Sequence, residues 1–257
     1  MSGPSLAELR ATGQPPEVIE RLNDEHWAGR LYMRRVSPRA TWVFARLGWS
    51  PNAVTVAFIV CGVAAGVIVA LGGLWSAIVA AILIQAYLLF DCSDGELARW
   101  SGRFSPAGIY LDLIGHYLGE AALLTGLGFR AQGQLTVSGP YVTAGLAAAL
   151  LAMLVKAETD NVIVARAKSG LPQSHADEAL APHSPGLALA RRLAAGLKVH
   201  RIIQAVELSL LILVAAIIDA IAGNLTATRV LLLGCLVIAG LLVVAHLVAI
   251  VTSRRLR

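Results

Sequence analysis

The sequence predicts an all-α integral membrane protein, in which six transmembrane helices are preceded by a cytoplasmic juxtamembrane amphipathic helix. Of the 257 residues, 57% are hydrophobic and only 14% are charged, a balance that is rare among water-soluble domains. The apolar residues also form runs of about 20, the length that crosses a hydrocarbon core. We expect an interfacial segment over residues 1–48 and one six-helix membrane domain over residues 49–257.

The first region alternates aromatic and apolar side chains with arginines, as in Trp27, Leu31, Arg34 and Trp42. This pattern predicts an amphipathic helix that lies on the inner surface of the membrane and is bent where Pro38 interrupts it. A soluble helical hairpin is the alternative that the pattern leaves open. No short apolar stretch here ends at a cleavage-like site, so we expect no signal peptide.

Six apolar segments follow, at about 52–72, 74–98, 107–129, 139–166, 202–222 and 228–250. Lysine and arginine gather after the second, fourth and sixth segments, whereas the other links carry few charges. The positive-inside rule then places both termini and the basic links in the cytoplasm of a multi-pass protein of the cell inner membrane. The polar stretch 169–190, with its glycines and prolines, is expected to be a cytoplasmic loop.

The formal net charge of +5 is interpreted as a topology signal and as attraction to anionic membrane lipids, not as nucleic-acid binding. The three cysteines, Cys61, Cys92 and Cys235, lack the spacing of a zinc site or a disulfide framework, and we expect them to be packing residues. Gly62 and Gly66 are spaced for close helix packing.

Ionisable side chains gather where the second apolar segment ends and the third begins. Asp91 and Asp94 are three residues apart, and Asp112 and His116 are four apart, so each pair shares one face of its helix. Two adjacent antiparallel helices would bring the four groups together. Crowded carboxylates repel one another unless cations balance them, and hard oxygen ligands suit Mg²⁺ or Mn²⁺. The sequence therefore predicts a metal site.

The stretch from Asp91 to His116, DCSDGELARWSGRFSPAGIYLDLIGH, resembles the signature of the CDP-alcohol phosphotransferases, D-x2-D-G-x2-A-R-x8-G-x3-D-x3-D. Only the last position departs from it, because His116 stands where the signature has an aspartate. The positions that match in identity and spacing are Asp91, Asp94, Gly95, Ala98, Arg99, Gly108 and Asp112.

Weaker similarities extend beyond this stretch. Pro51, Asn52 and Thr55 are similar to the P-N-x-x-T segment with which many members begin their first span. The segment Ala165–Lys168 resembles a basic segment seen in members. The segment before the first span resembles the basic segment at the same place in the branch that includes di-myo-inositol phosphate synthases, through Arg34, Arg35, Ser37, Thr41 and Arg46.

The resemblance implies a membrane enzyme that transfers a phospho-alcohol group from a CDP-alcohol to a hydroxyl acceptor, in phospholipid or polyol-phosphate synthesis, and releases CMP. Asp91, Asp94 and Asp112 would hold one or two divalent ions. In members the fourth aspartate is the proposed general base, and His116 can take that role or bind metal because its imidazole accepts a proton near neutral pH. The implied nucleotide-binding residues are Asn52, Thr55, Gly95, Ala98, Arg99 and Gly108. Members are commonly homodimers.

The acceptor site must be sought among basic residues. Arg166, Lys168 and Arg201 lie at the predicted cytoplasmic ends of the fourth and fifth segments, where they would bind an anionic acceptor such as an inositol phosphate or a phospholipid. Arg191, Arg192 and Lys198 lie nearby and could bind the acceptor as well, and for each of the six residues the alternative is a topology charge without a substrate contact. Arg99 either touches phosphate or ties down a carboxylate.

Two other functions stay open at this point. His116 would also suit a catalytically degenerate homologue that binds CDP-alcohols. Glu120, one turn further, either orients His116 or satisfies a neighbouring helix. Carboxylates within a membrane also mark ion paths, so a divalent cation transporter is the second alternative. It fits less well, because the acidic residues gather at one end of two helices and do not extend across the membrane.

Overall fold

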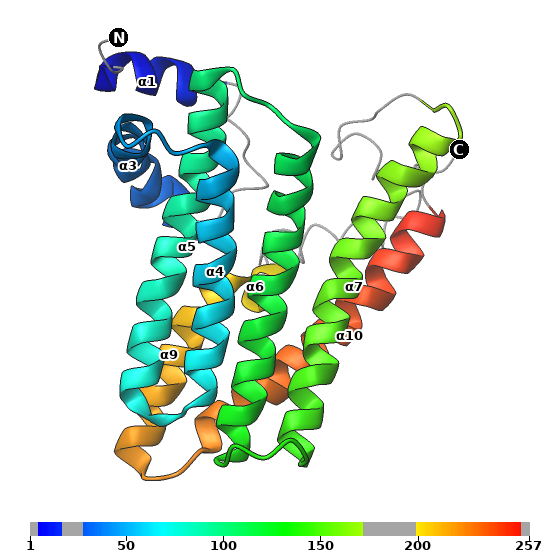
Figure 1. Cartoon of the computed structure of the whole chain (residues 1–257). Coiled ribbons are helices and arrows are strands. Elements are labelled where there is room, and N and C mark those ends of the chain that lie inside the picture. The colour runs from blue at the N-terminus through cyan, green and yellow to red at the C-terminus, as the bar shows by residue number, and fades with distance from the viewer. Residues whose placement is uncertain (1–4, 17–27, 172–198, 253–257) are drawn as a thin grey trace.

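A computed structural model describes residues 5–16, 28–171 and 199–252. All regular structure in these ranges is helical, which confirms the predicted all-α class (Figure 1). Some predicted features lie outside the described residues: Trp27, most of the predicted loop 169–190, and the basic residues Arg191, Arg192 and Lys198.

The N-terminal part contains α1 (Leu6–Gly13), the π-helical turn η1 (Gly29–Met33) and α3 (Arg34–Arg46). A 3₁₀ turn, η3 (Val199–Ile203), precedes α9. The longer helices are α4 (Pro51–Ala70), α5 (Gly73–Ser101), α6 (Pro106–Gln132), α7 (Pro140–Lys168), α9 (Ala205–Ala222) and α10 (Thr226–Thr252). They run alternately up and down, so the start of α4, the end of α5 and the start of α6 meet at the end of the bundle that carries α1 and α3 (Figure 1).

Within the described ranges, five helices are long and apolar enough to cross a membrane: α4, α5, α7, α9 and α10. This composition confirms the multi-pass prediction in its coarser form. The third predicted span, α6, has the length but not the apolar composition, because Asp112, Glu120 and Arg130 interrupt it. It packs between α4 and α7, so its polar groups can face protein. Its passage through the membrane stays a prediction.

The helices at the polar end begin with side-chain caps that the sequence encodes locally. Ser50 accepts a hydrogen bond from the Ala53 backbone N–H, and Ser105 accepts one from Gly108. In each case proline follows the serine as the first helical residue, where its missing N–H costs nothing. Gly102, with φ of 64°, ends α5 in the left-handed conformation. A short link therefore reverses the chain between α5 and α6.

Close contact between α4 and α6 depends on residues without side chains. A Cβ on Gly66 would lie 2.4 Å from the backbone of Ala122, and one on Gly126 would lie 2.1 Å from the carbonyl oxygen of Gly66. Gly62 meets Gly119 at a similar crossing, where its Cβ would be 3.1 Å from the Gly119 Cα. The predicted packing role of Gly62 and Gly66 is confirmed. It sets α4 directly against α6, beside the predicted site.

The helix α3 continues through Pro38 without a break, and the bend expected at this proline stays a prediction. Proline has no N–H to donate to the carbonyl oxygen four residues earlier, which belongs to Arg34. The side-chain amide of Gln14 donates to that oxygen instead, at 2.8 Å. Gln14, the C-cap residue of α1, thereby replaces the hydrogen bond that the proline removes. Such a long-range replacement cannot be inferred from the local sequence.

A buried carboxylate joins the N-terminal helices to α5. Glu96 is fully buried and accepts hydrogen bonds from Ser37 Oγ at 2.5 Å, Thr41 Oγ1 at 2.7 Å and Gln14 Nε2 at 2.8 Å. The neighbouring Arg99 donates from Nε to the carbonyl oxygen of Gly13, at 2.7 Å. Hydrogen bonds to charged groups are among the stronger ones. The end of α5 is thus fixed to both α1 and α3.

Three ionic side chains connect the helices at the opposite end of the bundle. Arg130 donates to the Gly73 carbonyl oxygen at 2.9 Å and to Ser76 Oγ at 3.0 Å, which ties α6 to α5. Asp219 of α9 accepts from the backbone N–H groups of residues 227 and 228, at 2.8 and 3.0 Å. Arg229 donates to the Ala131 carbonyl oxygen at 3.0 Å. These charges therefore serve packing.

Candidate active site

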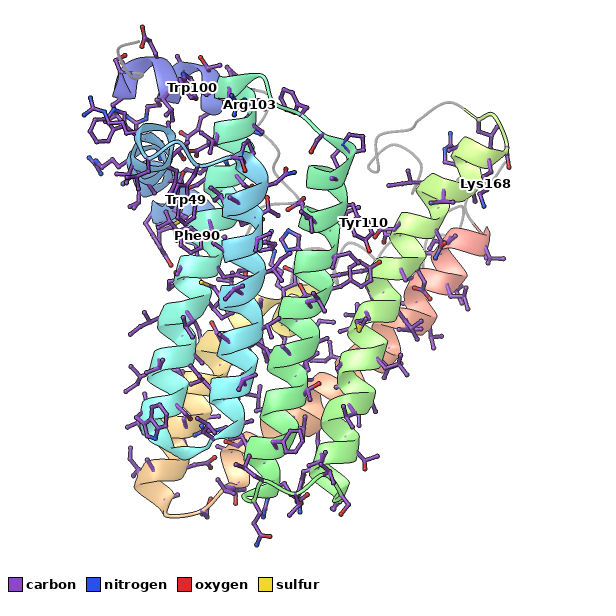
Figure 2. The ribbon with its side chains drawn as sticks, in the orientation of Figure 1. Trp49, Phe90, Trp100, Arg103, Tyr110 and Lys168 are labelled. Carbon is purple, nitrogen blue, oxygen red and sulfur yellow. The ribbon has the colours of Figure 1, made fainter. Side chains whose placement is uncertain are left out.

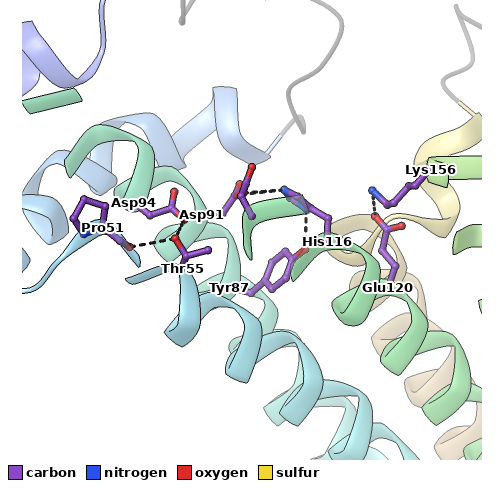
Figure 3. A network of polar contacts seen from close by, with 9 residues as sticks. Pro51, Thr55, Tyr87, Asp91, Asp94, His116, Glu120 and Lys156 are labelled. Carbon is purple, nitrogen blue, oxygen red and sulfur yellow. Dashed lines mark hydrogen bonds and ion pairs between the residues drawn. The ribbon is translucent and has the colours of Figure 1, made fainter. Parts of the chain in front are cut away.

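Three of the four predicted metal ligands meet between α5 and α6. The ligand atoms of Asp91, Asp112 and His116 all lie within 4.8 Å of one another, and Figure 3 shows His116 beside Asp91. His116 Nε2 is 3.2 Å from Asp91 Oδ1 and 3.7 Å from Asp112 Oδ1. We call these three residues the acidic cluster. All three are partly accessible, which a site that exchanges ligands requires.

Asp94, the fourth predicted ligand, lies one helical turn after Asp91 and is directed toward α4. Its Oδ2 accepts a hydrogen bond from Thr55 Oγ1 at 2.7 Å, and its exposed fraction is 8%. The same hydroxyl also contacts the Pro51 carbonyl oxygen at 3.1 Å (Figure 3). Asp94 therefore borders the cluster, and it connects the metal-ligand candidates to Thr55, which the resemblance assigns to the nucleotide.

The second nitrogen of His116 has a partner that the sequence reasoning missed. Tyr87 lies one turn before Asp91 on α5, and its hydroxyl is 3.0 Å from His116 Nδ1 (Figure 3). Its ring is almost fully buried, with 1% exposed. The spacing of Tyr87 to Asp91, four residues, was a signal that both side chains share a face.

The other nucleotide-binding candidates gather around the starts of α4 and α6. A Cβ on Gly108 would lie 2.8 Å from Asn52 Oδ1, and Asn52 Nδ2 is 3.4 Å from Ser105 Oγ. A Cβ on Gly95 would lie 3.1 Å from an Arg99 guanidinium nitrogen. The space beside each glycine is therefore bordered by a polar side chain. Ala98, half-buried, lies one turn after Asp94.

The acceptor-binding candidates come from other elements. Arg166 is half-buried and Lys168 exposed on the last turn of α7, and Arg201 is buried in η3 with 7% of its surface exposed. Figure 2 shows Lys168 at the same end of the bundle as Arg103 of the α5–α6 link. Arg191, Arg192 and Lys198 cannot be placed, since they lie outside the described residues.

Polar contacts between α6 and α7 were also missed from sequence. Glu120 pairs with Lys156 of α7 at 3.2 Å, and the Tyr117 hydroxyl donates to Asp160 Oδ2 at 2.9 Å. Glu120 therefore satisfies a neighbouring helix, one of the two roles predicted for it, while Tyr87 contacts the imidazole. The signal was present in the polar side chains of α7 from Lys156 to Asp160, within a segment that is otherwise apolar.

The acidic cluster fits a divalent cation by its chemistry. It offers two carboxylates and one imidazole nitrogen, the donor types that bind Mn²⁺ and, through the oxygens, Mg²⁺. A third carboxylate, Asp94, is one turn away on the same helix. A cation would also offset the repulsion between the carboxylates. The structure therefore contains a possible metal site, without deciding which ion it takes.

Comparison with known proteins shows which family the chain belongs to. A family model described as CDP-alcohol phosphatidyltransferase matches residues 49–252, which include every candidate site residue. The chain belongs to this family. It is therefore one of the CDP-alcohol phosphotransferases, enzymes that transfer substituted phosphate groups, as the signature predicted. No curated protein matches the chain.

A solved structure has the same fold as this CDP-alcohol phosphotransferase. The crystal structure of the phosphatidylinositol phosphate synthase of Mycobacterium tuberculosis with CDP-DAG bound aligns with a TM-score of 0.59. The alignment covers 86% of this chain and 96% of the other, at 19% sequence identity. At this identity the likeness describes the fold.

Proposed function

We propose that this family member transfers a phospho-alcohol group from a CDP-alcohol to a hydroxyl acceptor, with release of CMP, and that the reaction depends on a divalent cation. The observation that carries the proposal is the acidic cluster, in which the ligand atoms of Asp91, Asp112 and His116, all at positions of the family signature, lie within 4.8 Å of one another. The replacement of the fourth aspartate thus leaves three potential ligands together.

Asp91, Asp94 and Asp112 would hold Mg²⁺ or Mn²⁺, and His116 Nε2 would complete this set of ligands only while no acceptor is bound, because its one lone pair cannot bind the cation and take a proton at the same time. When bound there, the cation would neutralise charge on the diphosphate and on the departing CMP. The hydrogen bond from Thr55 of α4 would hold the Asp94 carboxylate of α5 in place. The asparagine and the glycines around the helix starts, with Ala98 and Arg99, would border the cytidine and phosphates.

In the proposed reaction, the acceptor hydroxyl oxygen bonds to the phosphorus that carries the alcohol. The bond from that phosphorus to the CMP oxygen breaks, and CMP leaves with this oxygen. His116 Nε2 takes the hydroxyl proton as general base. Asp91 Oδ1, at 3.2 Å from Nε2, would stabilise the resulting imidazolium.

The substrates belong to two chemical classes. A CDP-alcohol donor is supported by the family, and the structural neighbour was solved with the lipid donor CDP-DAG. We assign Arg166, Lys168 and Arg201 to an anionic acceptor, either a phospholipid or a polyol phosphate. Arg201 supports this assignment because a buried guanidinium can offer several donors to a phosphate away from competing water.

We further propose that residues 1–48 form the interfacial segment and residues 49–257 the catalytic domain, in the inner membrane, with the site and both termini in the cytoplasm. The helix α3 supports this placement. It buries Ser37 and Thr41 against α5 and leaves Val36 and Val43 exposed. Leu31 of the preceding turn η1 is exposed as well, so these apolar side chains are available to lipid. A homodimer is proposed from the family resemblance alone.

The test is CMP release by the purified chain with a panel of CDP-alcohols and acceptors, with and without Mg²⁺ or Mn²⁺, and with products identified by mass spectrometry. Asp112→Ala should abolish release. His116→Ala should lower kcat by about 10²–10⁴-fold, the usual contribution of a general base, and His116→Asp should retain more activity. Full activity of His116→Ala would exclude the general-base role.

Failure to release CMP from any CDP-alcohol would instead indicate a non-catalytic homologue. Uptake of radioactive Mg²⁺ into proteoliposomes would indicate a transporter, and the proposed enzyme should show none.

A further inference from the structure

We infer that Tyr87 is a positioning residue for His116: its hydroxyl contacts Nδ1 and so directs Nε2 at the carboxylates of Asp91 and Asp112. The inference rests on the proposed function, because it assigns a partner to the residue that replaces the last aspartate of the signature. It concerns a residue outside that signature.

The contacts engage both edges of the imidazole. Tyr87 OH lies 3.0 Å from Nδ1, while Nε2 lies 3.2 Å from Asp91 and 3.7 Å from Asp112. Tyr87 and Asp91 are four residues apart on α5, so one helix face contacts both nitrogens of a ring from α6. The contacts therefore define the rotation of the ring about its Cβ–Cγ bond.

The space around Tyr87 is shaped by glycines from two helices. A Cβ on Gly62 of α4 or on Gly119 of α6 would lie 2.9 Å from the Tyr87 ring. Only residues without side chains admit the ring at these positions. Because the phenol lies between the two helices, its hydroxyl cannot move away from Nδ1 without a shift of the ring itself.

A second aromatic ring completes the support. Phe58 packs against Tyr87 with ring centroids 4.2 Å apart, and it meets the His116 ring in a T-shaped arrangement with centroids 5.1 Å apart. A Cβ on Gly115 would lie 2.1 Å from Phe58 Cε1. The imidazole thus lies beside two aromatic rings, and the Phe58 ring occupies the space that a side chain at Gly115 would need.

A hydroxyl is chemically suited to this place because it can donate or accept. When Nε2 carries its hydrogen toward Asp91, Nδ1 accepts from the tyrosine O–H. When Nε2 must offer its lone pair to a cation or to a proton, Nδ1 carries the hydrogen and the tyrosine oxygen accepts. Partners of metal-ligating histidines set ring orientation in this way.

The test is a double-mutant cycle on the full chain in detergent, with Mn²⁺ binding measured by calorimetry without nucleotide. Tyr87→Phe should weaken binding about 10–100-fold, as expected for a residue that orients a ligand. In a His116→Asp background the same substitution should change affinity by less than about twofold, because no imidazole remains to be oriented. Tyr32→Phe is the matched control, since that hydroxyl donates to Gln85 of the same helix, and it should leave binding unchanged.

The inference is overturned if Tyr87→Phe binds like the unmodified chain, if it weakens binding equally in both backgrounds, or if the unmodified chain binds no Mn²⁺. CMP release, measured in parallel, separates this inference from the proposed function. If the effect of Tyr87→Phe on Mn²⁺ binding depends on His116 but no CMP is released, the positioning role holds and the proposed function is wrong. If CMP is released but the effect does not depend on His116, the proposed function holds and the positioning role is wrong.

Discussion

At the residue scale, Thr55 determines how a buried carboxylate of the site is held. Its hydroxyl reaches from α4 to Asp94 Oδ2 at 2.7 Å and also contacts the Pro51 carbonyl oxygen of its own helix. Asp94 is only 8% exposed, so water cannot readily replace this donor. A carboxylate without sufficient donors in such a place is unfavourable in its charged form.

We predict that Thr55→Val lowers the rate of CMP release. Valine keeps the shape of threonine but removes the donor, and a hydrogen bond to a charged group contributes about 1.5–3 kcal/mol, which corresponds to roughly tenfold or more in rate. The measurement is kcat/KM for the CDP-alcohol at saturating Mg²⁺.

Thr143→Val is the control for this prediction. Its hydroxyl contacts only the carbonyl oxygen of Gly139 four residues earlier, at 3.1 Å, at the opposite end of the bundle. Equal losses from both substitutions would show that the effect comes from the helix and not from Asp94.

Individual residues show which parts of the site the sequence could predict. Asp91, Asp112 and His116 were expected together, because spacing fixes which side chains share a helix face. Spacing says nothing about the offset between helices. The contacts of Tyr87 with His116, of Lys156 with Glu120 and of Ser37 with Glu96 depend on that offset, so they appear only in three dimensions.

At the scale of elements, α1, α3 and α5 meet where α3 contains a proline, and a side chain from the end of α1 supplies the hydrogen bond that this proline removes. Pro38 leaves the Arg34 carbonyl oxygen without its usual donor, and Gln14 Nε2 supplies one at 2.8 Å. Gln14 also reaches Glu96 at 2.8 Å. The side-chain amide of Gln14 therefore connects all three helices. Its partner on α5, Glu96, is two residues from Asp94.

We predict that the cost of losing Gln14 depends on Pro38. Gln14→Met removes the donor from the Arg34 carbonyl oxygen, whereas in a Pro38→Ala background the new backbone N–H of residue 38 can satisfy that oxygen. The destabilisation should thus be smaller in the alanine background, by about 1 kcal/mol. Thermal unfolding of the four chains in detergent measures it.

Gln134→Met, at an exposed position of the α6–α7 link, provides the comparison and should be additive with Pro38→Ala. Additive behaviour of Gln14→Met as well would contradict the compensation, and would leave the buried contact with Glu96 as the main role of Gln14.

At the scale of the whole molecule, the two ends of the bundle use charged groups differently. At one end the carboxylates of the family signature gather. At the other end Arg130, Asp219 and Arg229 tie helices to one another. Composition predicted the all-helical class and the multi-pass character, which five long apolar helices within the described residues bear out. It also predicted a membrane crossing by α6, which stays a prediction because Asp112, Glu120 and Arg130 leave this helix without the long apolar stretch that its neighbours have.

We predict that the links on either side of α6 lie on opposite sides of the membrane. Phe104 in the α5–α6 link is 70% exposed, and Val137 in the α6–α7 link is 90% exposed, so a cysteine at either position should react readily with a membrane-impermeant maleimide. In right-side-out vesicles Val137→Cys should be labelled and Phe104→Cys protected. Inside-out vesicles should give the reverse pattern.

The unmodified chain is the control, because Cys92 and Cys235 are buried and Cys61 is half-buried within helices, and it should be labelled in neither preparation. Labelling of both new cysteines from the same side would mean that α6 does not cross the membrane. The alternation of the helices would then fail at α6, and the acidic cluster could no longer be assigned to the cytoplasmic face by the positive charges around it.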